Sequence, residues 1–594
     1  MRHSLRLRPA LSIAAALLLP VPAAAQTVPR VTSGVVVTAT VTPVPAETVG
    51  RTVSTLTRDD LTALGVSSLV DGLRLLPGVD LRARGGLGVQ TDFSLRGATF
   101  GQALVLIDGV RLNNAQSGHH NGELPAPIVG IDRLEVVAGP ASAVHGADAF
   151  GGTIQILTRR DRHATGEISG GTFGKATGQT SVSGYGVPAA WTLSAWGARS
   201  GGFMFDREYG MGGASVRGRV RSGMTLEARH QRRAFGANGF YGNSPSKEWT
   251  EGTVVSAQWH INRSAWSAQT RVAGRQHHDR FRWDIRRPGF AENTHTTQAF
   301  EADVTASRLA GSRLRVTLGT GGGGDWIDSS NLGDRTYGRA YGFLEGLWTP
   351  ASRVSVHGGA RVDHYSTFGT AWSPSLSIST VVNERVRLRT SAARAFRIPT
   401  FTERYYRDPA HQASEVLRPE RGWSLDIGAD LNLAGWALSV TPFARWDDDV
   451  IDWVRERAGD RWRTTNVHSV TTRGLELAAT RRWAGAVVRA HYTALDLHAA
   501  RPPLLSKYVL EYARQSAGLA MAVPTGWRTH LALTFDARDR VDGQQYVLVG
   551  GRVTRPLGRV AVFIEAANLL DETYREIAGV PMPGRTWSVG LRTR

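Results

Sequence analysis

From about residue 160 onward, apolar and polar residues alternate with a period of two in one segment after another. In residues 353–362, Val354 and Val356 fall on one face, while Arg353 and His357 fall on the other. Successive side chains of a strand point to opposite sides, so the pattern predicts β-strands with one apolar and one polar face. The segments 385–389, 436–441 and 530–536 repeat it. The chain must therefore fold around a very large sheet of such strands.

The first 25 residues predict an export signal. A basic start at Arg2–Arg8 precedes an apolar run at Pro9–Leu19 and the small residues Ala23–Ala25, the order found in secretory signal peptides. The apolar run is about a dozen residues, too short for the roughly 20 that a membrane-spanning helix needs. No later segment approaches 18 consecutive apolar residues, which excludes helical spans. We expect a signal peptide over 1–25 and a mature chain that begins near Gln26.

Two architectures fit strands of this kind. In a water-soluble sandwich the apolar faces meet inside, whereas in an outer-membrane barrel they face lipid and the polar faces line the lumen. The export signal and the many arginines at inward positions favour the barrel. So do aromatic residues near strand ends: Trp266, Trp348, Trp446, Trp453 and Trp587. Residues 161–594 give room for about 22 antiparallel strands at roughly 20 residues per strand and connection, and a barrel of that size needs a plug.

Residues 51–160 predict a compact α/β unit that serves as this plug inside the lumen. Thr57 and Ser68 each stand three residues before an aspartate, the spacing of a helix N-terminus. Leu69, Leu73 and Leu76 then fall on one helical face. The apolar run 103–107 predicts a strand buried on both faces. The segments 131–137 and 153–157 predict further strands.

Charge and composition exclude several classes of protein. The formal charge is +19, but the basic residues are spread along the chain rather than gathered in a stripe with stacking aromatics, which argues against nucleic-acid binding. The many arginines reflect either a bias of the genome toward arginine or attraction to anionic lipid headgroups or an anionic ligand. The chain has no cysteine, so it has neither disulfides nor thiol chemistry. No nucleophile–base motif or paired-acid arrangement stands out, so we expect no enzyme and no cofactor.

The order of short motifs along the chain resembles that of the TonB-dependent outer-membrane receptors, and in the plug most of all the cobalamin and ferric siderophore receptors. The plug motifs lie at 75–79 (LLPGV), 95–97, 105–110, 131–136, 139–146 and 149–156. The barrel motifs lie at 396–403, 417–420, 568–574 and 583–585. Two positions depart from the family pattern, because Ala138 stands where an arginine is usual and His145 where a tyrosine is common.

The leader 26–50 contains a segment, GVVVTAT, that resembles the TonB box. The resemblance implies that it pairs as an added strand with the periplasmic C-terminal domain of TonB, a mode in which main-chain hydrogen bonds provide affinity. The residues concerned are Val35, Val36, Val37, Thr38 and Ala39, within a box at 35–40. We expect no partner for this segment within the chain, because Pro43 and Pro45 stop it pairing onward. The alternative is a linker that happens to contain valines.

The polar segment 113–122 is placed by the resemblance at the plug apex, facing a ligand vestibule. The candidate ligand contacts are Gln116, Ser117, His119, His120 and Asn121; a solvated loop is the alternative. The candidate plug–barrel contacts are Arg96, Arg133 and Glu135.

Three other patterns invite a metal or nucleotide interpretation. His119–His120 and His277–His278 are adjacent pairs, and neighbours on a strand point to opposite faces, so one pair seldom supplies two ligands. For His277–His278 we favour a solvated barrel rim. Asp447–Asp449 is a candidate calcium site or, more often, a solvated turn. Residues 319–324 match GxGxxG but precede no helix, so glycines that ease a barrel strand past bulky neighbours are the better interpretation. We therefore predict no metal site.

The resemblance implies active import across the outer membrane of a Gram-negative cell, by a monomer embedded in lipid, of a small-molecule metal chelate. Cobalamin and ferric siderophores fit about equally. Haem is weakened, because Ser414-Glu415-Val416-Leu417 stands where haem receptors carry Asn-Pro-x-Leu after the Phe-Arg-x-Pro motif at 396–399. Other nutrients, or a passive pore or adhesin, are the remaining alternatives. A signalling receptor is disfavoured, because it would carry an extra domain between the signal peptide and Gly34.

Overall fold

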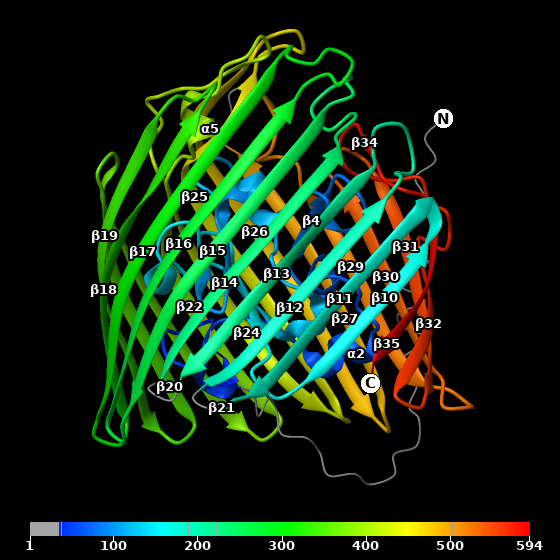
Figure 1. Ribbon diagram of the computed structural model, residues 1–594. Helices are drawn as coiled ribbons and strands as arrows, with labels where there is room; N and C mark the ends of the chain where they lie inside the picture. Colours follow the sequence, from blue (N-terminus) through cyan, green and yellow to red (C-terminus); the bar gives the residue numbers. More distant parts are fainter. Residues whose placement is uncertain (1–34, 37, 187–188, 221–222, 500–503, 594) are drawn as a thin grey trace, which may run out of the picture.

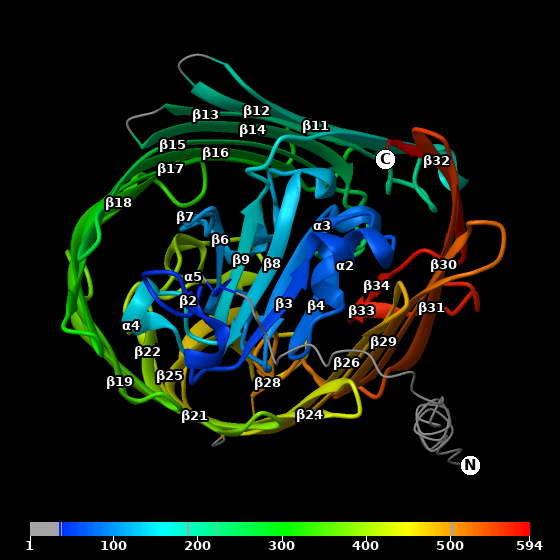
Figure 2. The same ribbon diagram turned by 90° about the horizontal axis from the view of Figure 1, so that it is seen from below.

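The structure is a computed structural model that describes residues 35–36, 38–186, 189–220, 223–499 and 504–593. Within these ranges, 22 long strands pair with their neighbours in antiparallel fashion and close into a barrel where β10 meets β35. Figure 1 shows the strands tilted around the wall, and Figure 2 shows the plug enclosed by them. This confirms the predicted fold. None of the described helices is long and apolar enough to cross a membrane.

The strands of the wall differ mainly in length. They are β10 (Ala164–Gly171), β11 (Lys175–Tyr185), β12 (Ala189–Ser200), β13 (Tyr209–Val220), β14 (Met224–Gly236), β15 (Lys247–Asn262), β16 (Trp266–Arg282), β17 (Glu292–Ala310), β18 (Leu314–Ser329), β19 (Arg335–Ala351), β20 (Val354–Tyr365), β21 (Gly369–Asn383), β22 (Val386–Arg397), β24 (Glu420–Leu433), β25 (Trp436–Arg455), β26 (Trp462–Trp483), β27 (Ala486–Ala499), β29 (Ala513–Pro524), β30 (His530–Arg540), β31 (Gln545–Leu557), β32 (Val560–Ala567) and β35 (Thr586–Thr593). Short elements lie between them: η6 (Thr172–Gly174), α5 (Phe401–Tyr405), β23 (His411–Gln412), β28 (Leu505–Ser506), β33 (Arg575–Ile577) and β34 (Val580–Pro581).

The alternation of the strands is inverted relative to a soluble protein. On β24, Trp423, Leu425 and Ile427 are exposed on the outer surface, while Ser424 and Asp426 are buried inside. Such an outer face suits lipid, and the closed ring leaves no sheet edge unpaired in it.

The two ends of the barrel have different connections. At one end the strands are joined by tight turns, such as Ala434-Gly435 between β24 and β25, where φ is +50° and +81°; positive φ at both central residues is the geometry that two-residue hairpins favour. At the other end the loops are longer, and the one between β22 and β24 carries α5 and β23. Outer-membrane barrels have short turns on the periplasmic side, so α5 marks the outer end.

The plug is built on a five-stranded sheet in the order β3-β8-β9-β6-β7, beside a β4–β5 hairpin. Strand β6, which lies between β9 and β7, is buried along its whole length, as predicted. The leader and plug elements are β1 (Val35–Val36), β2 (Val44–Pro45), η1 (Ala46–Thr48), β3 (Val53–Thr57), α2 (Arg58–Ala63), α3 (Leu69–Arg74), β4 (Val79–Ala83), η2 (Gly86–Gly88), β5 (Thr91–Leu95), η3 (Phe100–Gln102), β6 (Ala103–Ile107), β7 (Val110–Arg111), η4 (Gly118–Gly122), η5 (Ile128–Gly130), β8 (Ile131–Ala138), α4 (Ser142–His145) and β9 (Gly152–Thr158).

Both predicted helix starts in the plug are confirmed. The Thr57 hydroxyl accepts from the Asp60 N–H at 3.3 Å, and the Asp60 carboxylate accepts from the Thr57 N–H at 3.2 Å, which is a reciprocal capping box. Ser68 caps α3 through the N–H of Asp71 at 3.1 Å. The apolar faces of α2 and α3 then pack into the core of the plug, with Leu73 fully buried.

Polar contacts fasten the plug to the wall. Arg96 at the end of β5 is 1% exposed, donates to Glu476 at 2.9 and 2.7 Å and to Asp426 at 2.9 Å, and its guanidinium lies 4.1 Å from the centre of the Phe443 ring. Asp80 of β4 likewise accepts from Arg540 at 3.2 Å. The plug therefore sits in the lumen as a polar body in a polar tube.

The glycines of the segment 319–324 lie within β18, where neighbouring groups leave no room for side chains at several of the glycine positions. A Cβ on Gly323 would stand 1.9 Å from the Phe300 carbonyl oxygen, and one on Gly319 would stand 2.2 Å from the Phe343 ring. The strand interpretation is confirmed.

The structure corrects the expectation of a calcium site or a solvated turn at Asp447–Asp449. They belong to β25 rather than to a turn. Asp447 pairs with Arg445 at 2.7 Å and Asp449 pairs with Arg418, so these two carboxylates are matched by arginines of the wall and its loop.

Replacing Arg96 should loosen the plug. Arg96→Met leaves Asp426 and Glu476 buried without their cation, which typically costs about 3–5 kcal/mol, and we expect faster proteolysis of the plug in the folded receptor. The matched control is Arg58→Met, because Arg58 pairs with Asp161 at the surface, where such a pair contributes about 0–1 kcal/mol. Equal proteolysis of the two variants would contradict this.

Candidate functional site

The leader folds back on itself below the plug. Val35 pairs with Pro45 and Val36 with Val44, in an antiparallel arrangement. The expectation that the segment has no partner within the chain is therefore wrong. A proline lacks only an N–H, and its carbonyl can still take part in a two-residue ladder. Val37 lies outside the described residues.

Thr38 is held by two groups of the plug. Glu135 on β8 accepts both the Thr38 N–H at 3.0 Å and the Thr38 hydroxyl at 2.5 Å. The ring of His145 on α4 lies with Nε2 2.8 Å from the Thr38 carbonyl oxygen. Thr38, Ala39 and Thr40 are all buried. The second half of the predicted box is thus docked against the plug.

Arg133 and Glu135 are the other two candidate plug–barrel contacts. The hydrogen bonds described for them are to residues of the plug and the leader. Arg133 donates to Glu135 at 2.7 Å and to Asp132 at 3.2 Å. Arg133 therefore fixes the carboxylate that holds Thr38. The wall contributes through Glu345 on β19, which accepts from the Val41 N–H at 3.4 Å.

His145 is uncharged where it holds the leader. Burial, assisted by Arg111, Arg271 and Arg361 nearby, lowers the pKa of His145 to about 3. A neutral imidazole with its proton on Nε2 donates to the Thr38 carbonyl. The position where a tyrosine is common thus carries a donor to the leader.

At the other end of the plug, most of the polar segment is buried beneath the surface. Gln116 donates from its side chain to Asp279 on β16 at 2.8 Å, and Asn121 accepts from the Asn114 N–H at 2.9 Å. Ser117 caps η4 through the His119 N–H at 3.4 Å. Because α5 also donates its first N–H groups to the carbonyls of Ala115 and Gln116, these residues anchor the apex.

The two apex histidines have different surroundings. His119 stacks on Phe100 at 4.2 Å and bonds through Nδ1 to Asp92 at 2.8 Å. His120 instead points to the wall, where its ring lies 4.5 Å from that of His277, and its Nδ1 lies 3.0 Å from Glu123 of the plug. Burial opposes the charged form of His120, but the hydrogen bonds with Asp279 and Glu123 outweigh it and raise its pKa well above the usual range.

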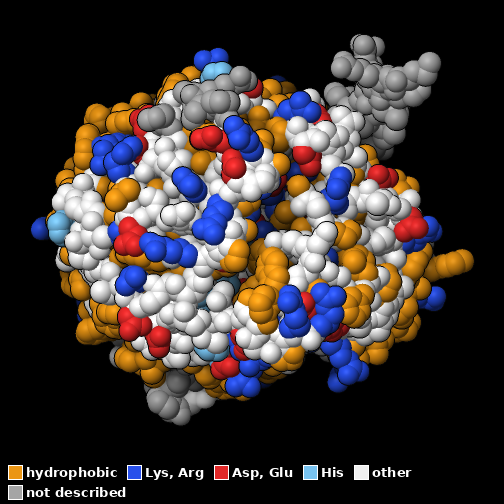
Figure 3. Space-filling view, turned by 90° about the horizontal axis from the view of Figure 1, so that it is seen from above, with side chains coloured by type: hydrophobic (Ala, Val, Ile, Leu, Met, Phe, Trp, Pro, Cys, Tyr) orange, Lys and Arg blue, Asp and Glu red, His pale blue; other side chains and the backbone are white. Residues whose placement is uncertain are grey.

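Partly exposed aromatic residues surround His119. Tyr508 lies 5.0 Å from Phe100 and 5.8 Å from His119, and Tyr241 approaches His119 from another side at 6.5 Å. Lys507 adds a cation 5.3 Å from the Tyr508 ring, and burial lowers the pKa of Lys507 to about 8. From above, the molecule is hollowed at its centre (Figure 3). We call the following five residues the aromatic floor: Phe100, His119, Tyr241, Lys507 and Tyr508.

Two family descriptions match the chain in the same order as its two parts. The description "TonB-dependent Receptor Plug Domain" matches residues 45–153, and "TonB dependent receptor-like, beta-barrel" matches residues 161–571. The chain belongs to the TonB-dependent receptor family. Members of this family are receptors and transporters rather than enzymes, and import nutrients across the outer membrane of Gram-negative cells.

Relatives and solved structures agree with this assignment. The chain is 25% identical over 463 residues to the vitamin B12 transporter BtuB of Photobacterium profundum, a match that covers 73% of this chain and 74% of that protein. The fold is similar to that of the siderophore receptor PirA from Acinetobacter baumannii, with 16% identity and a TM-score of 0.73 over 91% of this receptor and 98% of PirA. A mutant of the ferric enterobactin receptor PfeA from Pseudomonas aeruginosa gives 18% identity, the same TM-score and the same coverage.

Sequence reasoning named His119 but missed the other four residues of the aromatic floor of the receptor. Phe100 lies in the plug, Tyr241 between β14 and β15, and Tyr508 between β28 and β29, so nothing local relates them. Aromatic residues within polar loops were the available signal.

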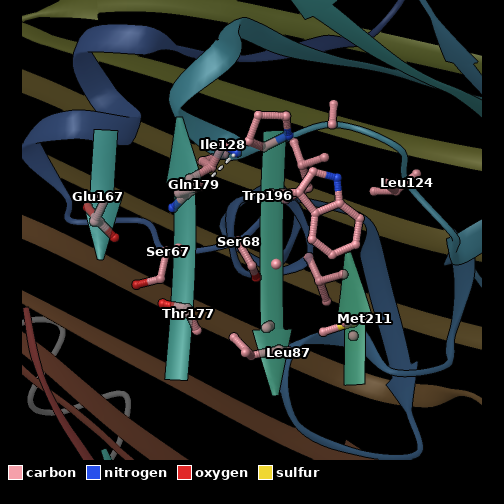
Figure 4. A pocket seen from close by; sticks show the side chains of 18 of the residues that line it. Ser67, Ser68, Leu87, Leu124, Ile128, Glu167, Thr177, Gln179, Trp196 and Met211 are labelled. Atoms are coloured by element: carbon pink, nitrogen blue, oxygen red, sulfur yellow. Dashed lines mark hydrogen bonds between the residues drawn. The ribbon is translucent and has the colours of Figure 1, made fainter. Parts of the chain in front are cut away.

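A cavity of about 90 Å³ separates the plug from the wall of the receptor on one side. Ser67, Leu124 and Ile128 line it from the plug, and Gln179, Trp196 and Met211 line it from β11–β13 (Figure 4). The N–H of Ile128 donates to the Gln179 side chain at 3.0 Å across its rim. Packing is looser here than along the face fastened by Arg96.

Neutralising Glu135 should free the leader. Hydrogen bonds to a charged group contribute about 1.5–3 kcal/mol and those to a neutral group about 0.5–1.5 kcal/mol. Because Gln keeps an acceptor oxygen but loses the charge, Glu135→Gln should raise the released population roughly tenfold. The chain has no cysteine, so a spin label on Thr42→Cys reports the leader alone. Glu47→Gln is the control, because that side chain is exposed on η1. An unchanged spectrum in Glu135→Gln would argue against this contact.

Docking of the leader should weaken in acid. The docked state holds His145 with a pKa of about 3, against an ordinary value of 6.5; if release restores the ordinary value, the released state binds more protons as the pH falls below 6.5. The same label should be more mobile at pH 5 than at pH 7.5, and His145→Gln should flatten this difference. The arginines near His145 stay charged throughout. His364→Gln, on an exposed histidine of β20, should leave the pH dependence intact.

Proposed function

We propose that this receptor imports a bulky metal chelate, either cobalamin or a ferric siderophore. The transport is driven by TonB, which binds the segment 35–40. The ligand binds above the plug at the aromatic floor. TonB, energised by the proton-motive force, then pulls on the leader from the periplasmic side and opens a path between plug and wall.

The position of the leader carries the proposal. Thr38 contacts β8 and α4 of the plug, and Val41 contacts β19 of the wall, so a pull on this segment acts directly on the plug. The segment just before them is already extended, the conformation that strand addition requires. A passive pore or adhesin would need neither feature.

The cargo is inferred from relatives and from chemistry. The named relatives BtuB of Photobacterium profundum and Vibrio vulnificus, at 25% and 24% identity, favour cobalamin. The aromatic floor with Lys507 beside it favours an aromatic anion, the character of a catecholate siderophore, since rings stack and cations attract negative groups. Both classes are metal chelates too large for ordinary porins.

Haem is less well supported. Arg397 of the Phe-Arg-x-Pro segment is buried and donates to Glu403 at 3.0 Å and to Glu420 at 2.7 Å. These contacts give Arg397 a structural role at the base of the loop that carries α5, and leave it no free group for a ligand.

Breaking the extended segment should separate binding from transport. In Val36→Pro the backbone loses an N–H that strand pairing uses, so we expect uptake of labelled ligand to fall to background while binding at the surface persists. Val36→Thr is the control, because it keeps the N–H and a β-branched side chain. Normal uptake by Val36→Pro would contradict energised transport through this segment.

The ligand is identified by direct comparison. Cells that lack their own receptors and make this protein are given labelled cobalamin, ferric catecholate or ferric hydroxamate, and both binding and uptake are measured. Saturable binding of one compound, reduced at least tenfold by Tyr508→Ala, supports that class of cargo and the aromatic floor. Binding of none of the compounds would contradict the proposed chelate cargo.

A further inference from the structure

We propose that His120 and Glu123 of the plug, together with His277 of the wall, form a binding site for a divalent transition-metal ion of the Zn²⁺ class, with Glu248 and Asp279 beside it. The site joins the plug apex to β15 and β16. It is independent of the imported ligand.

The fold assembles this cluster from three places in the sequence. His120 lies in η4, and Glu123 is the first residue after this helix. On β16 the side chains of His277 and Asp279 point inward, whereas His278 is exposed outside and bonds to Thr296 at 3.1 Å. In the adjacent strand β15, Thr250 pairs with Asp279 of β16. Glu248 lies two residues before Thr250 on the same face of β15 and so lies near Asp279. Each adjacent histidine pair thus contributes one imidazole to the cluster.

The distances suit one small ion. Donor atoms of His120, Glu123 and His277 lie within 4.8 Å of one another, and so do those of His120, Glu248 and Asp279. His277 Nε2 is 3.3 Å from Glu123, and His120 Nε2 is 3.6 Å from Asp279. A bound ion needs these atoms about 2.0–2.2 Å from its centre, and donors at such separations surround that point after small side-chain movements.

The carboxylates of Glu123 and Asp279 have imidazoles, and no arginine or lysine, as their ion-pair partners among the described residues. In the described parts of the chain, Glu123, Glu248 and Asp279 form no ion pair with an arginine or lysine, although the wall pairs many other buried carboxylates in this way: Glu476 with Arg96, Glu420 with Arg397, Asp363 with Arg361 and Asp108 with Arg229. Buried carboxylates are expensive unless paired, hydrogen-bonded or bound to a metal. Two histidines and a metal ion would supply what arginine supplies elsewhere.

Two polar atoms of the cluster are left without partners. His277 Nδ1 and Asp279 Oδ1 are buried and accept or donate no hydrogen bond within the described residues, and the side chains of both residues are only 7% exposed. Native proteins rarely leave such atoms unsatisfied without an unseen ion or water.

The surroundings also resemble the outer shell of a metal site, in which ligating carboxylates are hydrogen-bonded. The Thr250 hydroxyl donates to Glu123 at 3.0 Å, and the Gln116 amide donates to Asp279 at 2.8 Å. Imidazole and carboxylate donors together suit Zn²⁺, Co²⁺ or Fe²⁺ and are unlike the all-oxygen sites of Ca²⁺ or Mg²⁺.

The test is metal binding by the purified, untagged receptor in detergent after treatment with a chelator. We expect one equivalent of Zn²⁺ per chain to survive gel filtration at pH 7.5. Co²⁺ in its place should give visible absorption bands of a four- or five-coordinate site. His277→Gln and Glu123→Gln should each weaken Zn²⁺ binding by more than about 100-fold, beyond the roughly 10- to 100-fold that loss of an outer-shell group typically costs.

The matched control is His278→Gln, one residue along β16 and on the outer face, which should bind Zn²⁺ as the unmodified receptor does. Since a variant can fail to fold, the unmodified receptor alone also decides: absence of a retained equivalent, or six-coordinate Co²⁺ typical of surface carboxylates, overturns the site. Equal loss in His277→Gln and His278→Gln overturns it as well. Normal ligand uptake with no bound metal would leave the transport proposal intact while refuting this one.

Discussion

Charged side chains of the plug and the wall form ion pairs with one another in the lumen of this barrel. The rest of the structure depends on this pairing. A sheet closed in lipid must turn its apolar faces outward, because an open edge or an inward apolar face leaves polar groups in hydrocarbon. The inward faces of β24 and β25 are consequently polar, and include buried groups such as Asp426 and Arg445. The plug displaces water from much of this space, so many charges of wall and plug are paired with one another.

This way of fastening the plug suits a part that has to move. Buried ion pairs recover little net free energy, because desolvation offsets most of their attraction. An apolar interface of similar size would hold the plug more firmly, and would expose hydrophobic surface whenever the plug shifted. Arg96 with its two carboxylates, and Arg540 with Asp80, instead fix position and orientation. The cavity beside β11–β13 lies away from these pairs and marks the side on which the packing yields more easily.

Local patterns in the sequence were sufficient for the architecture, because alternation, capping and motif order are all local. The strand faces at 353–362 and the caps at Thr57 and Ser68 needed no knowledge of distant residues. The sites are different in kind. His120 and His277 could be judged only as members of adjacent pairs, and an adjacent pair on a strand gives one ligand. Their meeting depends on which wall strand faces η4, which the alternation does not encode. Pairing within the leader was missed because Pro45 argued against a strand, although a carbonyl alone suffices there.

The leader presents TonB with a competition rather than a free strand. Addition of Val35 and Val36 to a foreign sheet has to displace β2, or use the opposite edge of β1. A two-residue ladder contributes little, since each hydrogen bond is worth about 0.5–1.5 kcal/mol net. The contacts of Thr38 with Glu135 and His145 are stronger, because the first is charge-assisted and buried and the second is at least partly buried. The first half of the segment is therefore easy to capture and the second half hard to release. That order lets a partner grip the leader before any force reaches the plug, and makes Glu135 the point at which a pull is first resisted.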